Sequence, residues 1–461
     1  MTETATRNRL LPALVYAALA TAIVSSLGML LVPAVARDMD VPVATAQWML
    51  TVNLLVGAIA TPVMGRLADG PHRKRLLLVA LWIILAGSIV AAVAPNFTVF
   101  LVGRALQGLT YGIVPVTIAL ARRHLPSDVA HFGIASLSVT VSTGIGIGYP
   151  LTGVIAGLFD YRFAFWFAVL FVATTLVVVG RTVPDGPDGA AERTPFDLAG
   201  ALLLGGGLAL LLLGIGEGPH WPAGWTAGVF AGAAALLACW VLTELRRRHP
   251  LVDLRSLGNS EVLLANATAL GLGVVMYMFL SVVSLIAQAP EATGYGAALP
   301  LFWAGFVMLP FSVGSFGANR TARVLTRRVD SRALLPIGAG MLTAASMLLW
   351  AVHTELWGVV LGMLLFGVGI GFTYAAMPTL IARSVPGRDV GSAIGFNQVL
   401  RTIGGSFGTA VVGALLAVRV APDGHATEAG IGLTLGLAAV GCAVVLAALL
   451  AHWAGSRRRA A

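Results

Sequence analysis

Long apolar stretches separated by short polar breaks dominate this sequence. Fourteen of them contain about 20 mainly apolar residues, the length that an α-helix needs to cross a bilayer. They are apolar all round and longer than the alternating strands of a membrane barrel, which run to about 10 residues. With boundaries good to about 2–4 residues, the predicted helices are 11–35, 46–64, 76–95, 98–121, 131–157, 162–181, 198–216, 223–243, 262–288, 299–317, 334–352, 356–381, 391–418 and 430–454.

Composition agrees with a membrane protein. Of 461 residues, 58% are hydrophobic and 11% are charged, whereas about a quarter of the residues of a soluble domain are charged. Cys239 and Cys442 lie alone in apolar runs, without the spacing of a disulfide framework or a metal site. The predicted fold class is therefore an all-α polytopic membrane protein, with no cofactor and no metal.

The net charge of +9 reflects an excess of basic residues, and most of them lie in segments on one side of the predicted membrane. If the N-terminus is cytoplasmic, 24 of the 29 basic residues lie in cytoplasmic segments, three lie outside (Arg37, Arg162 and Arg419), and Arg104 and Arg401 lie within spans. This skew is the positive-inside rule. It predicts a multi-pass protein of the cell (inner) membrane with both termini in the cytoplasm, and it explains the basic charge without nucleic acid.

Two polar breaks divide the chain. Residues 181–195 are rich in Pro, Gly and acids, and residues 244–261 carry three consecutive arginines. They bracket two spans, so we expect an N-terminal six-helix bundle (1–182), linkers with an extra helix pair (183–261), and a C-terminal six-helix bundle with a short tail (262–461).

The two halves repeat one another weakly. The fourth and twelfth spans match at an offset of 263 residues. Two halves related by an axis along the membrane normal are a common plan of secondary carriers, with the substrate site at their interface. The repeat therefore favours a carrier. The matched pairs are Gly108 with Gly371, Tyr111 with Tyr374, Pro115 with Pro378, and Ile118-Ala119 with Ile381-Ala382.

A charged loop joins the second and third spans. Residues 65–75 read GRLADGPHRKR and include Gly65, Asp69, Arg73 and Lys74. The loop resembles the signature of the major facilitator superfamily, with His72 where the family has its second glycine and Gly70 where it has its first arginine. The resemblance implies a gate in which Asp69 faces a helix N-terminus, whose partial positive charge favours a carboxylate, here near residues 388–392.

The fourth span contains an arginine where a charge is costly and therefore suggests function. Residues 101–108 read LVGRALQG, with Arg104, Gln107 and Gly108. This segment resembles the fourth-helix motif of the same superfamily, which implies an arginine near the cavity that takes part in proton coupling. A purely structural role, in which Arg104 binds backbone carbonyls or reaches toward the outer surface, is the alternative.

The fifth span combines small residues at i, i+4 spacing with a proline. Residues 144–153 read GIGIGYPLTG, with Gly144, Gly148, Pro150 and Gly153. Glycines let helices approach closely and proline kinks them. The segment resembles the antiporter signature of drug exporters, although Tyr149 separates Gly148 from Pro150 and Thr152 precedes Gly153. Ordinary glycine-rich packing is the alternative.

Further matches extend over nearly the whole chain. Gln47-Trp48, Gly305 with Pro310, and residues 401–405 (RTIGG) are similar to segments of the fourteen-span drug/proton antiporter family. One departure is important. That family commonly has an aspartate nine residues before the terminal proline of its first helix, and here, counting from Pro33, the position holds Val24.

The membrane interior contains arginines and no carboxylate in the predicted spans. Asp38, Asp160 and Glu355 fall in outer loops, while Asp197 and Asp389 fall at cytoplasmic ends. The possibilities for proton exchange are then Asp69, histidines such as His131 near a helix end, or no group at all. We expect a cavity that accepts neutral or anionic hydrophobic molecules better than organic cations, which need an acidic or aromatic partner. Its possible lining residues are Asn53, Tyr111, Tyr149, Asn266, Tyr277, Tyr374, Asn397 and Gln398, with Arg104, Gln107, Gly108 and Arg401 as coupling or cavity residues.

The sequence therefore predicts a secondary transporter, not an enzyme, that exports a small hydrophobic molecule such as a drug, antibiotic or secondary metabolite. The expected mechanism is alternating access coupled to protons, in a monomer whose other partner is the lipid bilayer. An uptake carrier, a non-transporting sensor of the same fold and a membrane-embedded enzyme are the alternatives. The sequence contains no P-loop, the phosphate-binding motif expected of a transporter that is driven directly by ATP.

Overall fold

The computed structural model describes residues 3–460 apart from 69, 126, 185–196, 248–249, 252–253, 256–258, 326–330, 386–389 and 422–424. Its first half contains α1 (Glu3–Ser26), η1 (Met29–Leu31), α2 (Val32–Asp38), α3 (Val43–Ala46), α4 (Trp48–Ala68), α5 (Arg73–Val93), α6 (Phe97–Gln107), α7 (Thr110–His124), α8 (Ser127–Leu158) and α9 (Arg162–Thr182). The next two helices, which we call the inserted pair, are α10 (Leu198–Glu217) and α11 (Ala223–Arg246), joined by η2 (Gly218–His220).

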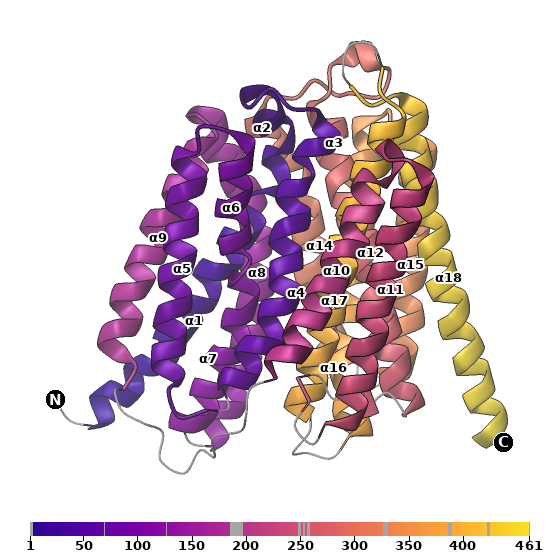
Figure 1. Ribbon diagram of the computed structural model, residues 1–461. Helices are drawn as coiled ribbons and strands as arrows, with labels where there is room; N and C mark the ends of the chain where they lie inside the picture. The colour runs from indigo at the N-terminus through magenta and orange to yellow at the C-terminus, as the bar shows by residue number, and fades with distance from the viewer. Residues whose placement is uncertain are drawn as a thin grey trace.

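The second half repeats the same kind of element. It contains α12 (Ser260–Gln288), η4 (Glu291–Thr293), α13 (Leu301–Val307), α14 (Leu309–Leu325), α15 (Ser331–Val352), α16 (Leu356–Ser384), α17 (Val390–Val418) and α18 (Glu428–Ala460). Both chain ends lie at the same side of the bundle (Figure 1), which we call the termini side; the opposite end is the far side.

The expected all-helical membrane fold is confirmed. Thirteen helices of the described chain are long and apolar enough to cross a membrane. The predicted fifth span corresponds to α8, whose described apolar part, Gly144–Leu158, is shorter than a span. The count of fourteen is therefore not confirmed.

Three predicted helices contain breaks that hydrophobicity does not reveal. The first is interrupted by η1, the fourth between α6 and α7, and the tenth between α13 and α14. At the break after α6, a Cβ on Gly108 would lie 2.6 Å from the backbone oxygen of Asn53. The absence of a side chain at Gly108 lets the fourth helix pack closely against α4 at this break.

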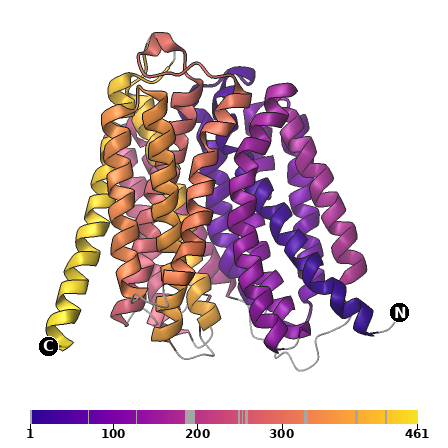
Figure 2. The ribbon, with the colours of Figure 1, turned by 180° about the vertical axis from the view of Figure 1, so that it is seen from behind.

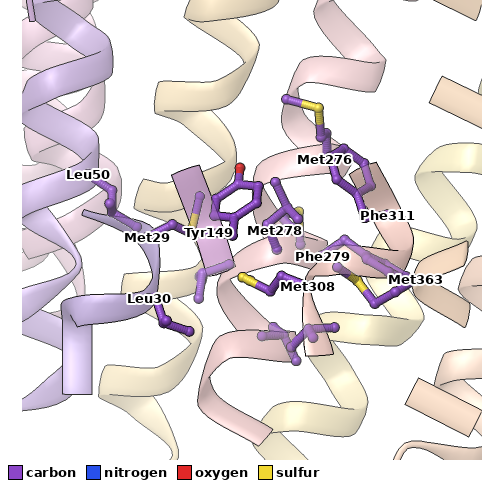
Figure 3. Packing of buried hydrophobic residues seen from close by; sticks show 14 of the residues in the cluster. Met29, Leu30, Leu50, Tyr149, Met276, Met278, Phe279, Met308, Phe311 and Met363 are labelled. Carbon is purple, nitrogen blue, oxygen red and sulfur yellow. The ribbon is translucent and has the colours of Figure 1, made fainter. Parts of the chain in front are cut away.

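The largest hydrophobic core joins both halves on the far side. Met29 and Leu50 from the first half belong to the same buried cluster as Phe279 and Phe366 from the second. Figure 3 shows part of this cluster, with the Phe279 ring beside Met308 and Met363. The Phe279 and Phe366 rings stack with centroids 4.0 Å apart. A second cluster is built from first-half residues alone, including Leu14, Leu81 and Val172.

Two seams connect the halves. At one seam α4 packs against α17, and at the other α8 packs against α13 and α14. A Cβ on Gly153 of α8 would lie 2.9 Å from the α-carbon of Gly305 in α13, so these two backbones touch directly. Figure 2 shows the α8 side of the molecule from behind.

The inserted pair lies over the other seam. α10 packs against both α4 and α17 as well as α11 (Figure 1). At its far-side end, Trp48 of α4 donates from Nε1 to Glu217 Oε1 over 2.9 Å. Below this bond, Ala201 of α10 belongs to a buried cluster with Phe396 and Val399 of α17.

Replacing Trp48 with phenylalanine is expected to lower the free energy of unfolding by about 1–2 kcal/mol, because a hydrogen bond to a charged, partly buried group is lost. Melting curves of the purified protein in detergent measure the change. The matched variant Glu217→Gln keeps an oxygen acceptor and should melt close to the wild type. Equal melting of Trp48→Phe and the wild type would show that this bond does not hold α10 in place.

Candidate functional site

A small pocket lies near the middle of the helices, where the two halves meet. Ten of its eleven lining residues come from the first half, and Tyr277 comes from α12. The lining residues are Ser25, Ser26, Met29, Leu50, Asn53, Leu54, Arg104, Tyr111, Ile145, Tyr149 and Tyr277. Asn53, Arg104, Tyr111, Tyr149 and Tyr277 were expected at a cavity from the sequence, whereas Ser25 and Ser26 were not.

Arg104 is the charged residue of this pocket, and its side chain is 0% exposed. Its Nε donates to the Met49 carbonyl over 3.3 Å, and its Nη1 donates to Gln107 Oε1 over 2.6 Å. Gln107 in turn donates to Ser88 Oγ over 2.9 Å. The Phe165 ring lies 5.9 Å from the guanidinium carbon, a cation–π distance. These contacts stabilise a charge that would otherwise be costly to bury.

One nitrogen of this guanidinium lacks such a partner. Nη2 of Arg104 is buried without a hydrogen bond in the described part of the chain. A Cβ on Gly28 would lie 2.5 Å from this nitrogen, so only glycine leaves room for it between α1 and η1. A buried unpaired donor costs about 1–3 kcal/mol, so this nitrogen is a costly feature of the folded protein unless an acceptor is placed against it.

Asn53 and the tyrosines shape the rest of the pocket. Asn53 donates to the Arg104 carbonyl over 3.0 Å. Tyr111 and Tyr277 approach with their hydroxyl oxygens 3.3 Å apart, which joins the first half to the second. Tyr149 is 2% exposed and belongs to the core cluster near Met29 and Met278 (Figure 3). The pocket is thus a polar interior enclosed by apolar packing.

The other expected cavity residues do not line this pocket. Arg401 of α17 stacks over the Tyr374 ring, 4.1 Å from its centroid, and donates to Gln398 Oε1. Neither Arg401 nor Tyr374 lines the pocket, although Arg401 is only half-buried. Asn397 donates to the Ala265 carbonyl and to Asn266 Oδ1, each over 3.0 Å. Asn397 therefore joins α17 to α12, away from the pocket lining.

The predicted fifth-helix motif lies at helix contacts of α8. A Cβ on Gly144 would lie 2.8 Å from the Ala22 side chain, and one on Gly148 would overlap the Ser26 hydroxyl, both in α1. Gly153 touches Gly305 across the seam, and Pro150 lies inside α8. The motif thus positions α8 against both α1 and the second half.

The predicted gating loop is described in part. Arg73 donates from Nε to the Ala68 carbonyl over 2.6 Å, and Lys74 donates to the Gly180 carbonyl over 3.0 Å. Gly65 packs near Pro115 of α7. Asp69 and residues 388–389 of its expected partner region lie outside the described residues, as do the side chains of residues 390–392 and of His131, so their expected roles stay predictions.

Hydrogen bonds between the halves run from the pocket to the far side. Ser284 and Gln288 of α12 donate to the carbonyls of Met29 and Leu30 over 3.2 and 2.9 Å. The Thr51 and Thr409 hydroxyls lie 2.9 Å apart across the α4–α17 seam. These contacts hold the halves together on the far side of the pocket.

Comparison with known proteins identifies the family. The sequence pattern of the Major Facilitator Superfamily matches residues 13–409. The lincomycin resistance protein of Streptomyces lincolnensis is 29% identical over 390 residues, which cover 82% of this chain and 78% of the relative. The tetracenomycin C resistance and export protein of Streptomyces glaucescens is 28% identical over 418 residues, covering 84% and 72%.

A solved structure shares the fold. The crystal structure of a peptide transporter in complex with sulfate superposes with a TM-score of 0.67 over 95% of this chain and 93% of that chain, at 15% sequence identity. The family pattern spans most of the chain, including both halves and the pocket residues between them. The chain therefore belongs to the Major Facilitator Superfamily and is a membrane transporter rather than an enzyme.

Proposed function

We propose that the protein exports a small hydrophobic molecule in exchange for protons, by alternating access between the halves formed by residues 1–182 and 262–461. Two relatives are named for resistance to lincomycin and to tetracenomycin C, and the second is also named for export. Binding sites between two repeated halves are typical of carriers. The proposed cargo is therefore a drug-like or antibiotic-like compound.

The observation that carries this proposal is the Arg104 guanidinium in the pocket. It is fully buried, it has one nitrogen without a protein partner, and it lies where the two halves meet. An incoming acceptor oxygen would satisfy that nitrogen and add a charge-assisted hydrogen bond. The site therefore favours substrates that present an oxygen acceptor or an anionic group beside an apolar body.

The same geometry disfavours organic cations. A cation needs a carboxylate or an open aromatic face, and the pocket lining has no carboxylate among the described residues. The Tyr374 ring already stacks with Arg401. A positively charged substrate would therefore meet two guanidinium groups and no counter-charge.

The proposed orientation follows from the basic loops. With both termini in the cytoplasm of the inner membrane, the far side faces outward, and the hydrogen bonds of Ser284 and Gln288 close the external end. The described contacts then support a state closed to the outside. We propose that the transporter works as a monomer, because each chain supplies both halves of the pocket.

The function is tested in inside-out membrane vesicles, where export is measured as uptake into the vesicle. Lincomycin and matched neutral, anionic and cationic fluorescent compounds serve as probes, with and without an acidic interior. We expect accumulation that collapses with the pH gradient, and preference for the neutral and anionic probes. Accumulation driven only in right-side-out vesicles would instead indicate uptake, and absence of flux in both orientations would favour the sensor.

Arg401→Ala provides the test of substrate charge within the same assay. Removing this guanidinium should improve accumulation of the cationic probe severalfold relative to the neutral one, because a like charge beside the cavity is lost. Vesicles containing wild-type protein at equal abundance are the control. Cation transport that is unchanged by Arg401→Ala and insensitive to anionic competitors would contradict the proposed selectivity.

A further inference from the structure

One face of α12 carries polar residues that contact the first half, and we call them the α12 stripe. They stand at i, i+4, i+7 and i+11, a spacing that places them on the same side of a helix, and they are Tyr277, Ser281, Ser284 and Gln288. Ser281 donates to the Met29 sulfur over 3.6 Å, and Ser284 donates to the carbonyl of the same residue. Gln288 donates to the Leu30 carbonyl. The stripe therefore holds the far side closed.

Tyr277 is the member of the α12 stripe that lines the pocket. The other ten described lining residues all belong to the first half. The hydroxyl oxygen of Tyr277 lies 3.3 Å from that of Tyr111, so the two tyrosines meet across the boundary between the halves. Cargo that sits among the ten first-half residues therefore contacts the second half through Tyr277.

Each of the two tyrosine rings packs on a helix of its own half. A Cβ on Gly57 of α4 would overlap the Tyr111 ring, and a Cβ on Gly405 of α17 would lie 2.7 Å from Cδ2 of Tyr277. Closely packed groups move together, because protein interiors compress little. When the halves part on the far side, Tyr111 therefore moves with the first half and Tyr277 with the second, and their hydroxyls separate.

We propose that Tyr277 gives the pocket a different affinity for cargo in the two states of the transporter. With the far side closed, the Tyr277 hydroxyl exchanges its Tyr111 partner for a cargo oxygen and donates to it. With the far side open, the α12 stripe has left the first half, and cargo held by the ten first-half residues loses this bond. The inference rests on the proposed function, because it identifies a contact that an exporter makes during loading and breaks before release.

This arrangement also narrows the class of cargo. Nη2 of Arg104 offers one donor and the Tyr277 hydroxyl offers a second, from the other half. Cargo that uses both therefore carries two oxygen acceptors on one face. One hydrogen bond of ordinary strength changes an affinity by about two- to tenfold. A ligand shifts an equilibrium between two states only through its different affinity for them, so cargo that bonds Tyr277 favours the closed far side.

Distances between spin labels on the full-length protein in lipid nanodiscs test the proposal. Labels on Thr98→Cys and Thr354→Cys are exposed at the far side and belong to different halves. Saturating lincomycin should raise the ratio of closed to open far side in otherwise unchanged protein by about two- to tenfold. Tyr277→Phe keeps the ring on Gly405 but removes the donor, so lincomycin should leave its ratio unchanged.

Tyr111→Phe is the matched variant, because it removes the same bond between the hydroxyls but leaves Tyr277 free to bind cargo. Without lincomycin, both phenylalanine variants should shift equally toward the open far side. With lincomycin, Tyr111→Phe should shift toward the closed far side at least as much as protein with both tyrosines. Tyr16→Phe, which removes a hydroxyl contact to Thr174 within the first half, is the control for loss of a hydroxyl elsewhere and should behave as the wild type.

The outcomes separate this inference from the proposed export. An equal response of Tyr277→Phe and Tyr111→Phe to lincomycin would overturn the inference, as would the absence of any shift in protein with both tyrosines. Lincomycin flux in vesicles without the shift would leave export standing and remove Tyr277 as the state-dependent contact. The expected shift without flux would support the role of Tyr277 and count against export.

Discussion

Replacing Arg104 with leucine is expected to reduce transport more than tenfold, a loss of about 1.4 kcal/mol or more of binding or transition-state stabilisation. The leucine side chain removes the free Nη2 donor and the charge in the pocket. It also leaves the Met49 carbonyl and Gln107 Oε1 without their guanidinium donors. Initial rates in inside-out vesicles at equal protein abundance measure the effect.

Arg104→Lys is the matched control for charge. An ammonium keeps the charge but lacks the planar fork that reaches Met49, Gln107 and the pocket together. Its transport should therefore lie between that of the wild type and Arg104→Leu, with a melting temperature near the wild type. Transport by Arg104→Leu at the wild-type rate would show that Arg104 serves only helix packing.

Gly404→Ala is expected to destabilise the second half by about 1–3 kcal/mol, the usual cost of forcing extra volume into close packing. A Cβ on Gly404 of α17 would lie 2.2 Å from the Leu270 carbonyl oxygen of α12. The two helices are equally close at the neighbouring contact, because a Cβ on Gly273 would lie 2.3 Å from the Arg401 carbonyl oxygen. The two helices would have to separate, and the melting temperature in detergent should fall clearly.

Gly395→Ala on the same helix separates packing from helix propensity. No heavy atom lies within 4 Å of a Cβ at Gly395. Alanine there should leave the melting temperature unchanged or raise it slightly, because alanine favours helix over glycine by up to about 1 kcal/mol. If Gly404→Ala and Gly395→Ala melted alike, the close approach of α12 and α17 would not be a determinant of stability.

The helices could be predicted from sequence because their signal is local. A run of about 20 apolar residues is sufficient to define a span, and no distant residue is needed. The breaks at η1, after α6 and after α13 depend on what each helix packs against, as Gly108 does against Asn53. Such contacts join segments far apart in the chain, so composition and periodicity do not contain them.

The candidate site likewise contains residues with a local sequence signal and residues whose role depends on contacts between distant segments. A charge in an apolar run is visible in the sequence, and for this reason Arg104 was found and lines the pocket. Ser25 and Ser26 were not singled out, because a serine in an apolar helix gives no sign that it lines a pocket. Asn397 looked equally polar, yet it serves a contact between α12 and α17. Which polar residue faces a cavity is decided by helix rotation.

The position of α10 makes the two flanks of the transporter unequal toward the surrounding lipid. Over the α4–α17 seam the bilayer touches a third helix, whereas the α8 seam faces outward in Figure 2 and the described residues place no helix across it. A hydrophobic compound dissolved in the membrane therefore contacts a bare seam between the halves on one flank, where Gly153 and Gly305 touch, and the helix α10 on the other. We expect any lateral capture of cargo, which requires the halves to part, to be directional within the plane of the membrane.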